Sequence, residues 1–120
     1  VFGGFDGDAL KSVYSFDLND LEWNKIKPLK KAINNYALAQ YQNYFILAGG
    51  DLDPDQLILY DAQTLTAKYF KMNFKGRDMG AAVIKDHLYV FGGSSIDRLQ
   101  NLSSDRLYRL PLSKLLPGAN

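Results

Sequence analysis

The sequence predicts an all-β protein built from repeated antiparallel units. The doublet Gly-Gly occurs at residues 3–4, 49–50 and 92–93, so the repeat intervals are 46 and 43 residues. Each doublet ends a short apolar run, and polar turn-forming residues separate these runs along the chain. A fixed period, together with short apolar runs bounded by turn signals, indicates units of short strands rather than helices.

The apolar runs predict up to four strands in each unit. A first strand and a polar turn are expected within 34–44 and within 77–87. The strands that end at the doublets follow, at 1–2, 44–48 and 88–91, and third strands are expected at 12–18, 57–62 and 106–112. Fourth strands are expected within 18–26 and 62–70. Short strands with regularly spaced turns favour an up-and-down antiparallel meander.

Local chemistry predicts how these strands turn and pack. Asp17 and Asp61 each follow an aromatic residue near the end of a third strand. Such an aspartate can accept a hydrogen bond from the backbone N–H two residues later, which closes a tight turn. The glycine doublets are expected to take positive φ and to let a neighbouring backbone approach closely. The aromatic side chains of the second strands, Phe91 among them, are expected to be buried between sheets.

The composition excludes several function classes. The chain has 14 basic and 13 acidic residues and a net charge of +1, so no global field attracts nucleic acid or an anionic membrane. It has no cysteine, which removes disulfides, thiolate metal sites and thiol catalysis. Its single histidine, His87, cannot form a zinc site alone and is expected in a solvated turn. No set of nucleophile, base and orienting residue is present in the sequence pattern.

Three alternating aspartates, Asp51, Asp53 and Asp55, have the spacing that opens a calcium loop. Such a loop next needs a glycine and a bidentate glutamate, where the sequence has Gln56 and Ala62. The pattern therefore favours a solvated turn between the second and third strands, and we expect neither a metal nor a cofactor.

Two further features allow a functional and a structural interpretation. The lysines at 25, 27, 30 and 31 form either a docking patch for an acidic partner or a solvated strand edge that discourages aggregation. The triplet Asn-Leu-Ser at 101–103 matches a glycosylation acceptor, in what is expected to be the longest loop, although such triplets also arise by chance.

With these residues in place, the chain resembles kelch repeats, which each form one four-stranded blade of a β-propeller. The resemblance rests on "VFGG", "LAGG" and "VFGG", on the pairs Phe16-Asp17 and Tyr60-Asp61, and on Trp23. Arg77, sixteen residues before Gly93, stands where many kelch units carry an arginine that opens the innermost strand. The resemblance implies an incomplete ring of kelch-type blades.

Three blades follow from this resemblance, and the chain departs from the kelch pattern in places. Residues 1–31 are expected to form a partial blade without its first strand, 32–75 a complete blade, and 76–120 a blade with an atypical or missing last strand. Ala67 and Pro117 replace the tryptophan, and Asn34 stands at the arginine position. Pro111 replaces the aspartate and removes a ladder donor, so the segment after it is either a turn of helix or a loop.

The loops between second and third strands differ in length while the strands do not. Loops tolerate insertions that packed sheets cannot, so this variation is typical of a scaffold with a binding rim. In kelch proteins these loops, with the loops between blades, commonly form the contact face. The residues that the resemblance nominates for partner binding are Asp6, Asp8, Asp51, Asp53, Asp55, Asp97, Arg98 and Gln100.

The sequence therefore favours a non-catalytic protein-interaction scaffold whose partners are other proteins and the remainder of its own propeller, with no nucleic acid and no membrane. The resemblance further implies a cytoplasmic or cytoskeleton-associated location. Two alternatives remain open at this point. The chain is also compatible with a part of a kelch-propeller enzyme of the sugar oxidase, mutarotase or specifier-protein type, or with an architectural piece bound through its strand edges.

Overall fold

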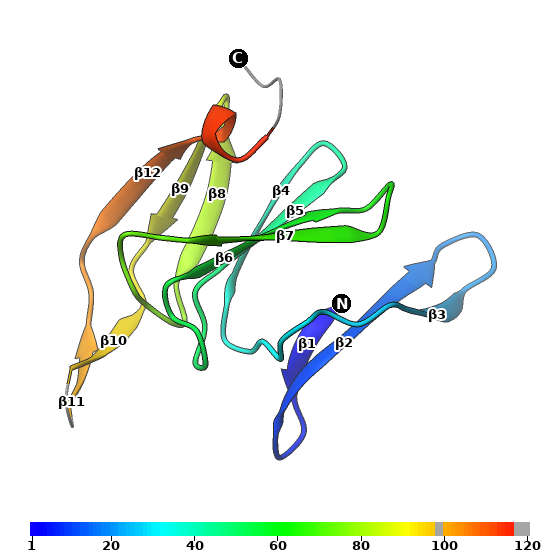
Figure 1. The fold of residues 1–120 in the computed structure, drawn as a ribbon, viewed down its shortest axis with the longest axis horizontal. Helices are drawn as coiled ribbons and strands as arrows, with labels where there is room; N and C mark the ends of the chain where they lie inside the picture. Colours follow the sequence, from blue (N-terminus) through cyan, green and yellow to red (C-terminus); the bar gives the residue numbers. More distant parts are fainter. Residues whose placement is uncertain (98–99, 117–120) are drawn as a thin grey trace. The chain divides into compact units, whose positions relative to one another are not determined.

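The computed structural model of the chain describes residues 1–97 and 100–116, as short β-strands with one turn of 3-10 helix (Figure 1). The chain divides into two compact units, residues 1–34 and residues 35–120, and each is described by itself. All strand pairs within the sheets are antiparallel, and all except β9–β12 join strands that follow one another in the chain, as the turn spacing predicts.

The first unit is a three-stranded sheet in the order β1 (Phe2–Phe5), β2 (Ala9–Asp17) and β3 (Glu22–Ile26). The following segment returns along β2, where the amides of Leu29 and Ile33 donate to carbonyls of that strand. Both side chains are buried, so this segment and the sheet close a small core together. β3 is an exposed edge, as the lysine-rich sequence predicts.

The second unit contains a complete four-stranded sheet in the order β4 (Ala37–Tyr41), β5 (Tyr44–Ala48), β6 (Gln56–Asp61) and β7 (Thr66–Lys71). Five consecutive residues of β6 are buried, so side chains on both faces of that strand are covered. This is the burial that its unbroken apolar run predicts. β7 is the outer strand, and its exposed residues alternate with partly buried ones.

The third sheet has three strands, β8 (Gly80–Ile84), β9 (His87–Phe91) and β12 (Leu107–Pro111), in the order β12-β9-β8. A separate hairpin of β10 (Ser94–Asp97) and β11 (Gln100–Ser103) lies between β9 and β12 in the chain. The expectation of a long loop there was wrong, because the residues pair into a ladder of their own.

The segment after Pro111 is a turn of helix, η1 (Leu112–Lys114), which resolves the alternative that the sequence left open. Leu112, Leu115 and Leu116 are buried in the core that also holds Ile46 and Leu88. The inner strands β4 and β8 lie side by side along this core. η1 therefore fills space between the second and third sheets, where a fourth strand would instead extend the third sheet outward.

Two sequence predictions about local geometry are confirmed and one is wrong. The Asp17 and Asp61 carboxylates accept hydrogen bonds from the amides two residues later, at 2.7 and 2.8 Å. The doublet glycines all have positive φ. Phe91, however, is 45% exposed, because its ring lies against its cross-strand partner Gly80 instead of between sheets. A glycine leaves a gap in the sheet surface that a cross-strand aromatic ring can cover.

Candidate functional site

Three segments of the second unit meet at one end of its sheets. The loop 49–55 leaves β5 and enters β6 beside the end of β7. The connection 72–79 leads from β7 to β8, and the β10–β11 hairpin begins just beyond the paired residues Gly80 and Phe91. Second-to-third-strand loops from two sheets and the connection between those sheets therefore share one surface, which we call the rim.

Backbone hydrogen bonds hold the rim segments together. The Gly50 amide donates to the Gly76 carbonyl, and the Gly76 amide donates to the Pro54 carbonyl, each at 3.0 Å. On the other side, Arg77 and Ser94 exchange two backbone hydrogen bonds of 2.9 Å. Main-chain bonds in both directions make the connection 72–79 an ordered bridge between the loop and the hairpin.

The glycine doublets allow these close approaches. Gly49 has a φ of +73°, and a Cβ on it would collide with the carbonyl oxygen of Gly76. Gly93 has a φ of +76°, and its Cβ would collide with the carbonyl oxygen of Arg77. Only glycine fits both the positive φ and the lack of space. Gly49 and Gly93 are thus explained by the backbone crossing at the rim, which confirms for these two glycines the close approach predicted from sequence.

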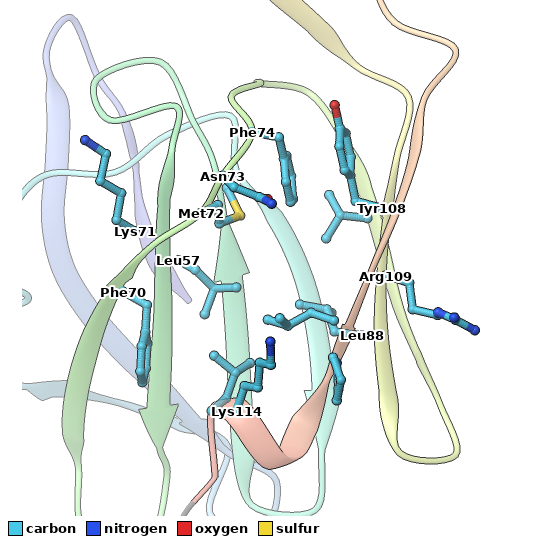
Figure 2. A pocket seen from close by; sticks show the side chains of 14 residues that line it. Leu57, Phe70, Lys71, Met72, Asn73, Phe74, Leu88, Tyr108, Arg109 and Lys114 are labelled. Carbon is cyan, nitrogen blue, oxygen red and sulfur yellow. The ribbon is translucent and has the colours of Figure 1, made fainter.

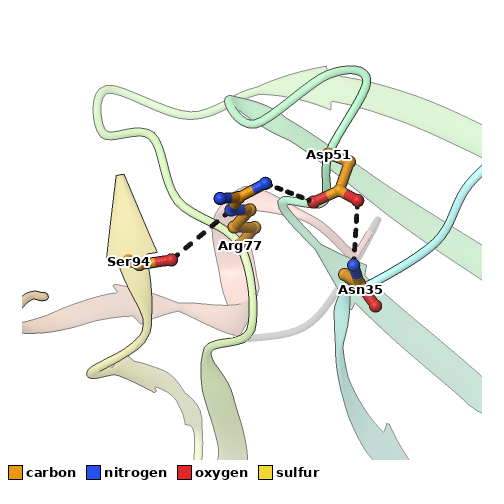
Figure 3. A network of polar contacts seen from close by, with 4 residues as sticks. All are labelled: Asn35, Asp51, Arg77 and Ser94. Carbon is orange, nitrogen blue, oxygen red and sulfur yellow. Dashed lines mark hydrogen bonds and ion pairs between the residues drawn. The ribbon is translucent and has the colours of Figure 1, made fainter. Parts of the chain in front are cut away.

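A polar network crosses the rim above these backbone contacts (Figure 3). The Arg77 guanidinium lies 3.3 Å from one carboxylate oxygen of Asp51, and the Asn35 side-chain amide donates to the other at 2.8 Å. Arg77 also donates through Nε to the Ser94 hydroxyl, at 3.4 Å. The Arg77 and Asp51 side chains are 25% and 27% exposed, so water screens their attraction only in part.

A polar hollow of about 330 Å³ lies beside this network, at the root of the hairpin. Four serines, two cations, one carboxylate and one phenol contribute to its wall, together with Met79 and Gly92. The polar residues are Ser94, Ser95, Ser103, Ser104, Lys75, Arg106, Asp105 and Tyr108. Such a wall can donate and accept several hydrogen bonds at once, which suits a polar or charged side chain of a partner.

Comparisons with known proteins bear on this architecture. Residues 1–30 match the Kelch motif family. A structural search matches 96 chains of known structure. One of them, "Structure of YjhT", is a kelch-type propeller protein that aligns with a TM-score of 0.66. The chain is a run of kelch-type propeller blades.

The likeness to the YjhT structure concerns the fold, since the sequence identity is 18%. The alignment covers 74% of this chain and 28% of that chain, so the present kelch blades span about a quarter of that propeller protein. A sequence comparison with curated proteins finds no match.

The rim of the kelch blades holds the predicted aspartates of the second unit, but not as free ligands. Asp51 is engaged by Arg77 and Asn35, and Asp55 lies 3.4 Å from the Lys71 ammonium. The Asp53 carbonyl accepts the Gln56 amide at 3.0 Å. Among the described residues, no three histidine, cysteine, aspartate or glutamate side chains gather as a metal-binding group.

The remaining nominated residues lie outside loop 49–55. Asp6 and Asp8 are exposed in the turn between β1 and β2, in the first unit. Asp97 ends β10 and pairs with Gln100 at the start of β11. Arg98 lies outside the described residues. Sequence reasoning missed Leu52, which is 60% exposed at the rim. Its signal was a single large apolar residue between the aspartates of an otherwise polar loop.

His87 lies at the opposite end of the kelch blade, beside the β8–β9 turn. It opens β9 and is partly buried, so the prediction of a solvated turn residue was wrong. Its Nδ1 lies 2.8 Å from a carboxylate oxygen of Asp86. The hydrogen bond from His87 holds the pKa of Asp86 below its ordinary value. In the part of the chain that the structure describes, no helix is long and apolar enough to cross a membrane.

Proposed function

We propose that these kelch blades act as a non-catalytic scaffold that binds another protein through the rim. The observation that supports this most directly is the fastening of loop 49–55, connection 72–79 and the β10–β11 hairpin to one another. A surface that is already ordered loses little conformational entropy on binding, which favours affinity.

The rim also offers two kinds of contact. Leu52 exposes a large apolar side chain, and the serine-lined hollow supplies hydrogen-bonding groups. An apolar anchor next to a polar recess is a common composition of protein-binding surfaces. Because Asp51 and Asp55 are engaged within the chain, they support the rim, and Leu52 and the hollow would meet the partner. We place this activity in the cytoplasm or on the cytoskeleton, on the family resemblance alone.

Site-specific photo-crosslinking in the complete protein tests the proposal. A photoreactive amino acid replaces Leu52 at the rim in one variant and Leu65 in the matched control. Leu65 is 45% exposed in the β6–β7 turn, at the other end of the same sheet. We expect protein adducts from position 52 that are absent from position 65, and we expect Leu52→Arg to abolish binding of the crosslinked protein. Equal adducts at both positions, or none at 52, would contradict rim binding.

A further inference from the structure

A second surface of the second unit, next to the rim, has the features of a peptide-binding groove. It is about 430 Å³ in volume and lies between β6 and β7 on one side and β9, β12 and η1 on the other (Figure 2). Its apolar wall is formed by Leu57, Phe70, Leu88, Val90 and Leu110. At the rim side of the groove, the Phe74 and Tyr108 rings stack with centroids 3.9 Å apart.

The groove lies where the third sheet has one strand fewer than the second. β7 is the fourth strand of its sheet, whereas β12 is the outer strand of a three-stranded sheet among the described residues. After Pro111 the chain turns into η1 and enters the core. The outer edge of β12 is therefore an edge to which a further strand can add.

The register shows which groups this edge presents. Gly92 donates to the Arg106 carbonyl and Leu112 donates to the Asp86 carbonyl, so these residues mark hydrogen-bonded pairs at both ends of the β9–β12 ladder. Because such pairs alternate along an antiparallel ladder, Tyr108 and Leu110 direct their backbone groups to β9. The N–H and C=O groups of Leu107 and Arg109 then point outward.

The same alternation explains the proline of β12. Pro111 lies two residues after Arg109, so its missing N–H belongs to the outer edge, where no ladder bond is lost. The outer edge thus offers two N–H donors and two carbonyl acceptors, those of Leu107 and Arg109. Tyr108 and Leu110 are partly buried on the groove side, while Arg109 is exposed on the other face of the strand.

Charge defines the chemistry of an added strand. The groove lining includes three cations, Lys71, Arg109 and Lys114, and no carboxylate. Lys114 extends from η1 toward the groove, and Arg109 points away from it on the outer face of β12 (Figure 2). Lys71 already pairs with Asp55 and Lys114 faces the groove, so Arg109 is the cation that the outward face of an added strand would meet.

We propose that the outer edge of β12 binds an extended acidic segment of a partner protein as a fourth strand. Apolar side chains of that segment alternate into the groove over Phe70 and Leu57, and its carboxylates lie on the other face, opposite Arg109. Main-chain hydrogen bonds to Leu107 and Arg109 supply the pairing. This site adjoins the rim, with which it shares Tyr108, but the proposal rests on the edge of β12 and does not depend on rim binding.

Hydrogen exchange in the complete protein tests whether the outer edge of β12 is free and pairs with an added strand. The Leu107 and Arg109 amides should exchange rapidly in the free protein and at least tenfold more slowly with a saturating acetylated seven-residue peptide of alternating leucine and glutamate. The Tyr108 and Leu110 amides are the internal control, because they face β9 and should be slow in both states. Slow exchange at Leu107 and Arg109 without peptide would show that the protein covers this edge itself, and that result overturns the proposal.

Charge reversal tests whether the edge of β12 prefers an acidic segment, with peptide affinities measured by fluorescence polarisation. The variant Arg109→Glu should bind the acidic peptide about tenfold more weakly, because opposite charges across strands attract and like charges repel. The same variant should prefer a peptide of alternating leucine and lysine. Lys85→Glu, in the β8–β9 turn, makes a charge reversal away from the groove and should bind like the parent protein. Equal binding of both peptides by all proteins would overturn the assigned chemistry.

Backbone N-methylation separates strand addition from simple apolar contact. Methyl groups on the peptide amides that face β12 should abolish binding, and methyl groups on the amides that face away should leave it unchanged within about twofold. Equal affinity of the two methylated peptides overturns strand addition.

Discussion

Substitution of Asp51 by alanine is expected to loosen the rim. The carboxylate accepts a 2.8 Å hydrogen bond from Asn35 and lies 3.3 Å from the Arg77 guanidinium. At an effective dielectric constant of about 20, the gross attraction over that separation is roughly 5 kcal/mol. Desolvation and side-chain entropy oppose most of it for groups that are about a quarter exposed. We therefore expect Asp51→Ala to lower the free energy of unfolding by about 1.5–2 kcal/mol.

A double-mutant cycle with Arg77→Ala isolates the ion pair. Urea unfolding of the parent, both single variants and the double variant should give a coupling free energy of about 0.5–1 kcal/mol. Faster hydrogen exchange at the Gly50 amide, which donates to Gly76, should accompany the loss. Asp6→Ala, at an exposed position of another loop, is the control and should change stability by less than about 0.5 kcal/mol. A coupling within about 0.3 kcal/mol of zero would refute the view that the pair fastens the rim.

Four further substitutions test other parts of the kelch blades. Gly49→Ala should destabilise by roughly 2–4 kcal/mol and Gly92→Ala by only about 1 kcal/mol, because both have positive φ but only Gly49 lies against a neighbouring backbone. His87→Ala should raise the pKa of Asp86 toward its ordinary value, as measured by NMR titration, because the His87 hydrogen bond lowers it. Leu112→Ala should cost about 2–5 kcal/mol in urea unfolding, since its side chain is 2% exposed in the core.

Each of these has a control and an opposing outcome. Equal losses for the two glycine variants would show that the close approach adds nothing to the positive φ. The depressed pKa of Asp86 implies a contribution to stability that is present above the unfolded carboxyl pKa and is lost as the pH falls through the folded value. An unchanged Asp86 pKa without His87 would show that other groups, and not the His87 hydrogen bond, lower it. Ser113→Ala, at an exposed position of η1, is the control for Leu112→Ala. If both variants lost equally little free energy of unfolding, η1 would be peripheral to the core.

Most strands were predictable because their signals are local. An apolar run of four to six residues bounded by turn formers specifies a strand wherever it packs, and β5, β6 and β9 lie where their runs predict. The Asp61 turn was predictable for the same reason, since the bond spans two residues. The hairpin of β10 and β11 was missed, because its sequence lacks the apolar alternation that marks a strand.

The position of the rim loops was predictable from sequence, but the contacts that their residues make were not. Loop length and the glycine period located the rim, because strands of fixed length bring equivalent loops to the same end of each sheet. Sequence could not show that Asp51 meets Arg77, 26 residues later, since that contact depends on two strand connections and a crossing of backbones. The interaction engages Asp51, a nominated binding residue, within the chain, while the neighbouring Leu52 is exposed.

The repeat period, the strand positions and the need for glycine at the doublets follow from the sequence, because each depends on neighbours along the chain. The tertiary structure decided that η1 fills the core, that Phe91 covers Gly80 and that β12 turns the amides of Leu107 and Arg109 outward. These outcomes depend on which distant segments pack together and in what register. A one-residue shift in that register would exchange the two edges of β12 and place Pro111 where a ladder donor is required.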